Sequence, residues 1–272
     1  MPPLVSICLP TLNARRFFEP RMETILAQTV KDWELIVCDS YSDDGTWEYL
    51  HKFKSDSRVR LYQVPREGLY AGWNECLRRC AGEYVYIATA DDTCLPQFLE
   101  RMLSVLGQAG SMGTDQWPCL AEPDPKGRKR PVDLAICKCE FIDEKDQIIT
   151  DPDAPFYAFD EWNDVPHVRG GDMELLAHLS LGVSWSSISS VVFRKKLLDT
   201  VGLFLTEYGP CGDIFWAVKT AIFTDAIWLP ESLATWRCYP EQGSRGKTLA
   251  SIKKIYKGLY EMVADSEAYL PS

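Results

Sequence analysis

The chain has 272 residues, of which 29 are basic and 39 acidic, so its formal net charge is -10. A hydrophobic fraction of 46% with 25% charged residues is typical of globular proteins and excludes disordered, collagen-like and coiled-coil chains. The acidic balance argues against a nucleic-acid partner, because phosphate binding needs a basic face. The basic run 126–130 lies among prolines and indicates a solvated loop.

The ten cysteines do not indicate a metal or disulfide framework. No Cys-x-x-Cys pair occurs, and the pairs Cys76/Cys80 and Cys137/Cys139 have the wrong spacing for a structural zinc site. The N-terminus lacks a basic segment followed by an apolar one, and no window approaches 18 uninterrupted apolar residues. We therefore expect a reduced, cytoplasmic chain without a membrane span.

The first hundred residues alternate between short apolar runs and stretches with helical spacing. The expected strands are 4–9, 33–38, 58–62 and 83–88, and the expected helices are 17–26, 47–53, 70–80 and 98–106. Strands and helices that alternate with such short connections predict right-handed parallel βαβ units with buried strands.

The second half is less regular. A loop or insertion is expected at 107–131 and an irregular aromatic stretch at 151–171. Strands are expected at 132–141, 187–193 and 226–229, and helices at 213–223 and 249–262. We predict one α/β domain, 1–272, with a mostly parallel Rossmann-like sheet flanked by helices. Its nucleotide-binding half is 1–106, and its acceptor-side half is 107–272.

Polar residues follow three of the expected strands, at 10–13, 39–46 and 89–92. In an open parallel sheet, ligands bind outside the carboxyl ends of the strands, so these segments predict a site. Helix capping is an alternative role for Asn13 and for Ser42 or Asp44, and capping does not exclude ligand contact.

Asp91 and Asp92 are adjacent carboxylates at a strand end. Their mutual repulsion would be offset by a divalent cation, and Mg²⁺ usually takes one or two carboxylates plus substrate phosphates. The pair therefore favours a metal–nucleotide site. The Gly-rich loops of dinucleotide enzymes and P-loop NTPases are absent from the sequence.

Taken together and in their order along the chain, these motifs resemble those of the family 2 glycosyltransferases of the GT-A fold. The matching segments are 5–13, 34–39 with Ser42, Asp44 and Thr46, 68–74, 81–84, 90–92, 192–195, 202–204 leading to Asp213, and 236–237. The resemblance covers most of the chain, and its N-terminal motifs are the more specific ones.

The resemblance implies a set of nucleotide-sugar contacts. Residues matching Pro10, Thr11, Asn13 and Asp39 hold the nucleoside in this family, where the aspartate accepts a hydrogen bond from the base. The resemblance extends the expected nucleotide-sugar contacts to Asn74, Thr89, Ala90, Asp91 and Arg237.

Two aspartates receive chemical roles from the same resemblance. Asp91 matches the last Asp of the Asp-x-Asp motif, which binds the divalent cation, Mn²⁺ or Mg²⁺, that bridges the diphosphate. Asp213 matches the general base of a Glu-Asp pair at a helix start, and an N-cap of the following helix is its alternative role.

Three positions depart from the family pattern. Thr89 replaces the first Asp of Asp-x-Asp, Gly212 replaces the Glu of Glu-Asp, and Tyr239 replaces a frequent His. Each change removes a potential metal or phosphate ligand, so we expect metal to bind weakly unless the nucleotide diphosphate is present.

The sequence thus predicts an inverting, metal-dependent and non-processive glycosyltransferase. We expect it to move a sugar from a nucleotide-diphosphate donor, preferably a UDP-sugar, to a hydroxyl of a glycan or glycolipid acceptor. One alternative is a nucleotide-sugar-binding relative without turnover, and another is a sugar-1-phosphate nucleotidyltransferase. The lysines of the expected helix 249–262 would allow peripheral contact with the inner face of a membrane, whereas packing of that helix on the sheet is the other interpretation.

Overall fold

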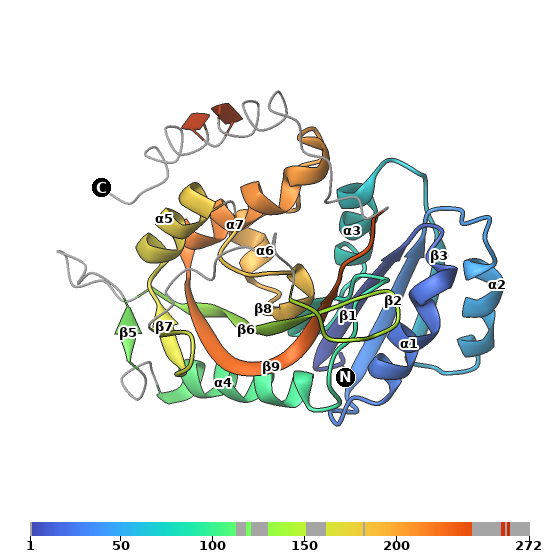
Figure 1. Cartoon of the computed structure of the whole chain (residues 1–272), viewed down its shortest axis with the longest axis horizontal. Coiled ribbons are helices and arrows are strands. Elements are labelled where there is room, and N and C mark those ends of the chain that lie inside the picture. Colours follow the sequence, from blue (N-terminus) through green and yellow to red (C-terminus); the bar gives the residue numbers. More distant parts are fainter. Residues whose placement is uncertain are drawn as a thin grey trace.

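The computed structural model describes residues 2–112, 118–120, 130–150, 162–181, 183–240, 257–258 and 260–261. Within these ranges, nine strands form one sheet in the order β3-β2-β1-β4-β8-β6-β9-β7-β5, with helices packed around it (Figure 1). None of the described helices is both long and apolar enough to cross a bilayer.

The first half confirms the predicted alternation. Its elements are β1 (Val5–Thr11), α1 (Arg15–Leu26), β2 (Trp33–Asp39), α2 (Thr46–Leu50) with a 3₁₀ turn (His51–Phe53), β3 (Val59–Gln63), α3 (Leu69–Leu77), β4 (Tyr84–Ile87) and α4 (Phe98–Met112). β1 pairs in parallel with both β2 and β4, and β2 pairs in parallel with β3. Every residue of β2 and β4 is buried, which explains why both strands are mostly apolar; Glu34 and Asp39 are the buried carboxylates of β2.

The second half extends this sheet with strands of both directions. Its elements are β5 (Cys119–Leu120), β6 (Val132–Ile142), β7 (His167–Arg169), α5 (Gly171–Leu181), a 3₁₀ turn (Ile188–Ser190), β8 (Val191–Arg194), α6 (Leu197–Val201), a 3₁₀ turn (Gly209–Cys211), α7 (Gly212–Phe223) and β9 (Asp225–Arg237). β8 runs antiparallel between β4 and β6, whereas β6 and β9 are parallel.

The longest strand, β9, was predicted as four residues and spans thirteen. Pro230 and Glu231 resemble a strand end, but the pairing with β6 steps from Cys137↔Leu229 to Lys138↔Ser232. These two residues are therefore bulged out of the ladder, where a proline needs no hydrogen-bond partner. Beyond the bulge the strand continues to Arg237, and Figure 1 shows the resulting curvature of β9.

Three other expectations for the second half were wrong. α4 continues through Gly107 to Met112, although 107–131 was expected to be a loop. The segment 188–190 is a 3₁₀ turn rather than the start of a strand. β7 lies within the stretch expected to be irregular, and α5 follows it where no element was expected. The expected helix 249–262 lies mostly outside the described residues, so its packing stays a prediction, as does the division into halves 1–106 and 107–272.

Two apolar clusters cover the two faces of the sheet. One contains buried side chains of α1, α2 and α4, and the other contains those of α3 and α6 together with Trp216 and Ala217 of α7. Burial of this kind contributes roughly 25 cal/mol per Å² of apolar surface removed from water. Helices thus cover both faces of the sheet. Polar residues gather at the uncovered edge, where the carboxyl ends of the parallel strands lie.

Gly82 lies where the chain leaves α3 and enters β4, directly against the backbone of β1. A Cβ there would lie 2.6 Å from the Ser6 nitrogen and 2.8 Å from the Val5 carbonyl carbon. We expect Gly82→Ala to lower the free energy of unfolding by about 1–3 kcal/mol, because main-chain atoms cannot move aside as a flexible side chain can. Urea unfolding measures this.

Gly107→Ala is the matched control. A Cβ at Gly107 would meet nothing within 4 Å, and the residue lies inside α4. Alanine should therefore leave the stability unchanged or raise it by about 0.5–1 kcal/mol. Equal unfolding free energies for the Gly82 variant and the unmodified chain would contradict the close approach.

Candidate functional site

Asp39 is the centre of the hydrogen bonds at the ends of β1 and β2. Its side chain is fully buried, and its Oδ1 accepts the hydroxyls of Thr11 at 2.9 Å and Ser42 at 2.6 Å. Its Oδ2 accepts the backbone N–H of Ser42 at 2.9 Å. Because an ionised carboxylate offers about four acceptor sites, Oδ2 retains capacity for one further donor.

Asn13 joins the loop after β1 to the loop after β2. It has a positive φ of 50°, and its amide exchanges two hydrogen bonds of 3.0 Å with Asp43, one to the carboxylate and one from the backbone N–H. Its own backbone N–H donates to the Ser42 hydroxyl. The two loops therefore form one exposed surface beside Asp39.

Asp44 accepts hydrogen bonds from the starts of two helices, although it is the N-cap residue of neither. Neither Asn13, Ser42 nor Asp44 is an N-cap residue, since α1 begins after Ala14 and α2 after Gly45. The Asp44 carboxylate nevertheless accepts the backbone N–H of Arg15 at 2.8 Å and that of Thr46 at 3.0 Å, which are the first groups of both helices.

Pro10 and Ala90 complete the strand ends. Pro10 lies in β1 opposite Cys38, beyond the point where β4 still pairs with β1. The strand therefore tolerates a residue without an N–H at this place. Ala90 is half-buried against the first apolar cluster. Their contacts with a nucleotide stay predictions.

Asp92 is a buried hub that ties three segments together. One of its oxygens accepts the backbone N–H of Arg237 at 2.9 Å. The other accepts the hydroxyls of Thr89 at 2.6 Å and Ser187 at 3.0 Å. Thr89 also bonds the Ser189 hydroxyl at 2.7 Å. The second carboxylate of the Asp91–Asp92 pair is thus engaged by protein donors.

Asp91 is half-buried, whereas Asp92 is buried. The surroundings of Asp91 disfavour the ionised form of its carboxyl group. Burial and the neighbouring charge of Asp92 raise its pKa to about 6, although the Tyr239 hydroxyl donates to its Oδ2 at 3.0 Å. A cation beside Asp91 would offset both causes, so the residue fits a metal ligand. Among the described residues, no three or more His, Cys, Asp or Glu side chains are grouped to hold a metal ion. Asp91 would therefore hold a cation together with ligands from the substrate.

Arg237 locks the end of β9 to the Asp91 loop. Its guanidinium is fully buried and donates to the Asp91 carbonyl at 2.7 Å, the Asp143 carbonyl at 2.8 Å and the Asp146 carboxylate at 2.6 Å. The group also lies over the Phe17 ring at 4.7 Å. Its three nitrogens all have protein acceptors, so the structure gives Arg237 a positioning role, and direct contact with a nucleotide stays a prediction.

Asn74 has a similar protein partner. Its buried amide donates to the Phe204 carbonyl at 2.8 Å and accepts the Phe204 N–H at 3.0 Å. The pair links α3 to the segment before α7. A role of Asn74 beside the nucleotide stays a prediction.

Asp213 lies in the first turn of α7, and its side chain is half-buried. Its Oδ1 accepts the Tyr70 hydroxyl at 2.7 Å and the Ile214 N–H at 3.0 Å. The N-cap of α7 is Cys211, without a side-chain capping bond, so the N-cap role considered for Asp213 was wrong.

Gly212 stands where the resemblance implies a Glu, and the structure leaves no room for a side chain there. A Cβ at this position would lie 2.4 Å from the Leu205 carbonyl oxygen and 2.7 Å from the Tyr70 ring. Any larger side chain is therefore excluded unless the backbone moves.

Sequence reasoning missed Tyr70, because its contact with Asp213 joins residues 143 positions apart and leaves no periodic signal.

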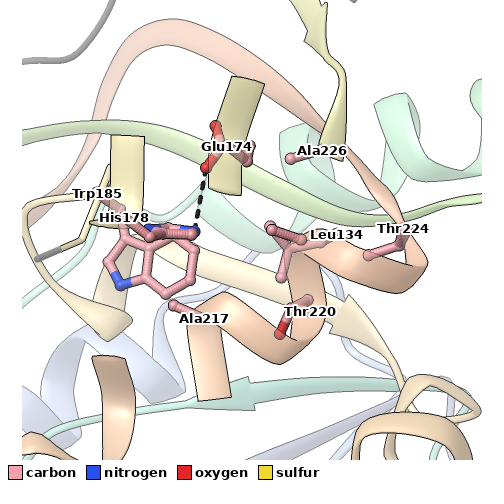
Figure 2. A pocket seen from close by; sticks show the side chains of 9 residues that line it. Leu134, Glu174, His178, Trp185, Ala217, Thr220, Thr224 and Ala226 are labelled. Carbon is pink, nitrogen blue, oxygen red and sulfur yellow. Dashed lines mark ion pairs between the residues drawn. The ribbon is translucent and has the colours of Figure 1, made fainter. Parts of the chain in front are cut away.

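A small cavity between β6, α5, α7 and β9 is separate from these strand-end residues. Figure 2 shows Glu174, His178 and Trp185 around it, with the Glu174 carboxylate 3.3 Å from the His178 Nε2. Its volume of about 10 Å³ is close to the minimum for a single water molecule. The cavity is therefore too small to hold a nucleotide or a sugar.

His178 is expected to reduce stability as the pH falls below neutrality. Its Nδ1 accepts the Ser184 N–H at 3.1 Å, which requires an unprotonated Nδ1, and burial lowers its pKa to about 4. An unfolded histidine titrates near ~6.5, so between these values the unfolded chain binds a proton that the folded chain does not. The free energy of unfolding should therefore fall by roughly 1.4 kcal/mol per pH unit over this window.

Urea unfolding at pH 7 and pH 5 checks this, with His178→Gln as the comparison. The glutamine variant should lose less stability between the two pH values than the unmodified chain. An identical loss in both proteins would show that His178 does not cause the pH dependence.

The strand order of the sheet and the helices that flank it define the GT-A fold. Residues 6–160, more than half of the chain, match the family described as Glycosyl transferase family 2. The chain therefore belongs to glycosyl transferase family 2.

Curated relatives match a little over a third of the chain. The putative glycosyltransferase EpsE of Bacillus subtilis (strain 168) is 34% identical over 107 residues, which is 38% of this chain and 38% of that protein. The Escherichia coli protein named UDP-Glc:alpha-D-GlcNAc-diphosphoundecaprenol beta-1,3-glucosyltransferase WfgD is 33% identical over 104 residues, 38% of this chain and 41% of its own length. The aligned part thus spans about two fifths of these relatives.

Solved structures share the fold over most of the chain. S. aureus TarS 1-349 in complex with UDP-GlcNAc gives a TM-score of 0.68 at 14% identity, covering 96% of this chain and 65% of TarS 1-349. The Pyrobaculum calidifontis mannosyltransferase PcManGT in complex with GDP-Man and Mn²⁺ gives 0.58 at 20% identity, covering 100% of this chain and 77% of PcManGT. At these identities the likeness establishes the fold.

Proposed function

We propose that this protein transfers a glycosyl group from a nucleotide-diphosphate sugar, preferably a UDP-sugar, to a hydroxyl acceptor with inversion. The observation that supports this most is the Asp213 carboxylate, half-buried in the first turn of α7 and oriented by the Tyr70 hydroxyl. Family membership and the buried Asp39 network at the strand ends add to it.

The donor half of the reaction would use the strand-end residues. Thr11, Asn13 and Asp39 would hold the nucleoside, with the remaining acceptor capacity of Asp39 directed to a base N–H. Asp91 would hold Mn²⁺ or Mg²⁺ together with the diphosphate. When bound, such a cation stabilises the negative charge that develops on the leaving diphosphate.

The acceptor half would use Asp213 as general base. Its carboxylate would take the proton of the acceptor hydroxyl while the hydroxyl oxygen attacks the anomeric carbon. The bond between that carbon and the diphosphate oxygen breaks in the same displacement, which inverts the configuration. A positioned base contributes typically 10²–10⁴-fold to such a step.

The acceptor is proposed to be a glycan or a glycolipid. Support comes from the relatives, since WfgD is named for a diphosphoundecaprenol acceptor and others are named chondroitin synthase. A lipid-linked acceptor would place the protein in the cytoplasm at the inner face of a membrane. The peripheral contact predicted for 249–262 would serve that location.

Nucleotide-sugar binding without turnover is the second candidate function. It is favoured by Thr89 and Gly212, which stand where the family has carboxylates, and by the protein partners that engage Arg237. Family membership argues against the nucleotidyltransferase alternative, which nothing in the structure favours.

One experiment separates these functions. UDP-, GDP- and dTDP-sugars are tested with Mn²⁺ by thermal shift, and each donor that stabilises the protein is then assayed for hydrolysis and for transfer. Turnover that is lost in Asp213→Asn supports the transferase. Stabilisation by a donor without turnover in the unmodified protein supports the binding protein.

A further inference from the structure

The helix α3 holds the segment that presents Asp213. Asn74 brackets the backbone of Phe204 with two hydrogen bonds, and Tyr70, one turn earlier, reaches Asp213. The two contacts lie on the same helix and fix two points of one segment, residues 204–213. The position of Asp213 therefore depends on α3 as well as on α7.

The Tyr70 ring is fixed before its hydroxyl makes any contact. It is 3% exposed, stacks on Phe204 with centroids 5.8 Å apart at 11°, and meets the edge of Trp73 at 5.0 Å. Phe204 in turn stacks on Trp216 of α7 at 5.0 Å. These aromatic contacts leave the ring little freedom, so the hydroxyl is preorganised toward Asp213.

Gly212 and Tyr70 share one space. The ring lies where a side chain at position 212 would stand, with ring carbons 2.7 and 2.9 Å from the site of a Cβ. The Tyr70 ring thus fills the space beside Asp213 that a side chain at position 212 would need.

We infer that Tyr70 is a positioning residue that orients the Asp213 carboxylate and keeps it ionised for proton abstraction. This inference rests on the proposed function of Asp213 as general base. A hydrogen bond to the charged form of an acid favours that form, and the Ile214 N–H on the same oxygen acts in the same direction. The phenol stays a donor at neutral pH, because burial and the charge of Asp213 raise its pKa well above the usual range.

Cys211 of the preceding 3₁₀ turn is a titratable group recorded beside this pair, and it is buried and affects Tyr70 electrostatically. Tyr70→Phe leaves this thiol in place, so a change in the ionisation of Asp213 between the two proteins reports the loss of the Tyr70 hydroxyl.

Tyr70→Phe removes the hydroxyl and keeps the stacked ring. We expect kcat to fall about 10-fold or more, because a hydrogen bond to a charged group is lost. KM for the donor should stay within about twofold. The acidic limb of the kcat–pH profile should move up by about one unit, since Asp213 then takes a proton more readily.

Tyr84→Phe is the matched control. It also removes a buried tyrosine hydroxyl, which accepts from Arg194 at 2.8 Å, but it lies on β4 and has no contact with Asp213. It should lower stability and leave the kcat–pH profile unchanged. If both variants change kcat equally without moving the profile, the role of Tyr70 is only structural and the inference is overturned.

A measurement without turnover separates this inference from the proposed function. The Asp213 carboxyl carbon is followed by NMR through a pH titration in the unmodified chain and in Tyr70→Phe. A higher pKa in the variant supports the inference, and equal values overturn it whatever the activity. Absence of transfer from every donor in the unmodified protein would refute the proposed function instead, and with it the catalytic role that Tyr70 is inferred to support.

Discussion

Asp213→Asn should lower the turnover of sugar transfer by at least about 100-fold, the lower end of what a general base contributes. The amide cannot take the proton of the acceptor hydroxyl. It keeps an oxygen that accepts the Tyr70 hydroxyl and the Ile214 N–H, so the start of α7 should stay folded. Donor affinity, measured by calorimetry, should stay within about twofold because the donor contacts are expected at the strand ends.

Asp199→Asn provides the control for this variant. Asp199 also lies in the first turn of a helix, α6, but its side chain is exposed. That variant should transfer sugar at the normal rate. If Asp213→Asn keeps near-normal transfer, the base lies elsewhere, and Glu207 of the same segment is the next candidate. Loss of folding without a specific loss of turnover would mean that Asp213 is structural.

The part of the fold that the sequence predicted consists of elements with local signals. β1, β2 and β4 are apolar runs buried on both faces, and the helices between them have one apolar face, so each is recognisable on its own. β9 was cut short because Pro230 looks like a stop, and only the partner strand β6 shows that it is a bulge. α5 carries the buried Glu174 and His178, which conceal an apolar face.

The same distinction applies to the candidate site. The strand-end rule pointed to Asp39 and Asp91, because Asp39 is the last residue of β2 and Asp91 lies in the segment that follows β4. The contacts that give these residues their properties join distant segments, such as Arg237 with the Asp91 carbonyl, 146 positions apart. Spacing in a sequence cannot report such pairs. A resemblance can name Asn74 as a site residue, but it does not reveal that Phe204 engages its amide.

The second large effect is expected for the metal dependence of donor binding. In the unmodified chain, Mn²⁺ should strengthen UDP binding by about 10-fold or more. Asp91→Asn should abolish that gain and leave the metal-free affinity unchanged, because Asp91 is the half-buried member of the carboxylate pair, whereas Asp92 is buried. The carboxylate of Asp92 already accepts from Arg237, Thr89 and Ser187. Calorimetry with Mn²⁺ and with a chelator measures the difference.

Two further variants make this test specific to Asp91. Asp39→Asn should weaken UDP binding with and without metal, since its buried carboxylate belongs to the expected nucleoside contacts. Asp143→Asn removes the charge of a half-buried residue that follows β6, near Arg237, and should leave the metal effect intact. Without UDP, the unmodified chain should bind Mn²⁺ weakly, because Asp91 then lacks the phosphate ligands that complete the coordination shell. Two results would exclude Asp91 as the ligand of a nucleotide-bridged cation. One is a metal that stays bound to the nucleotide-free protein after chelation, and the other is a UDP affinity that is the same with and without Mn²⁺.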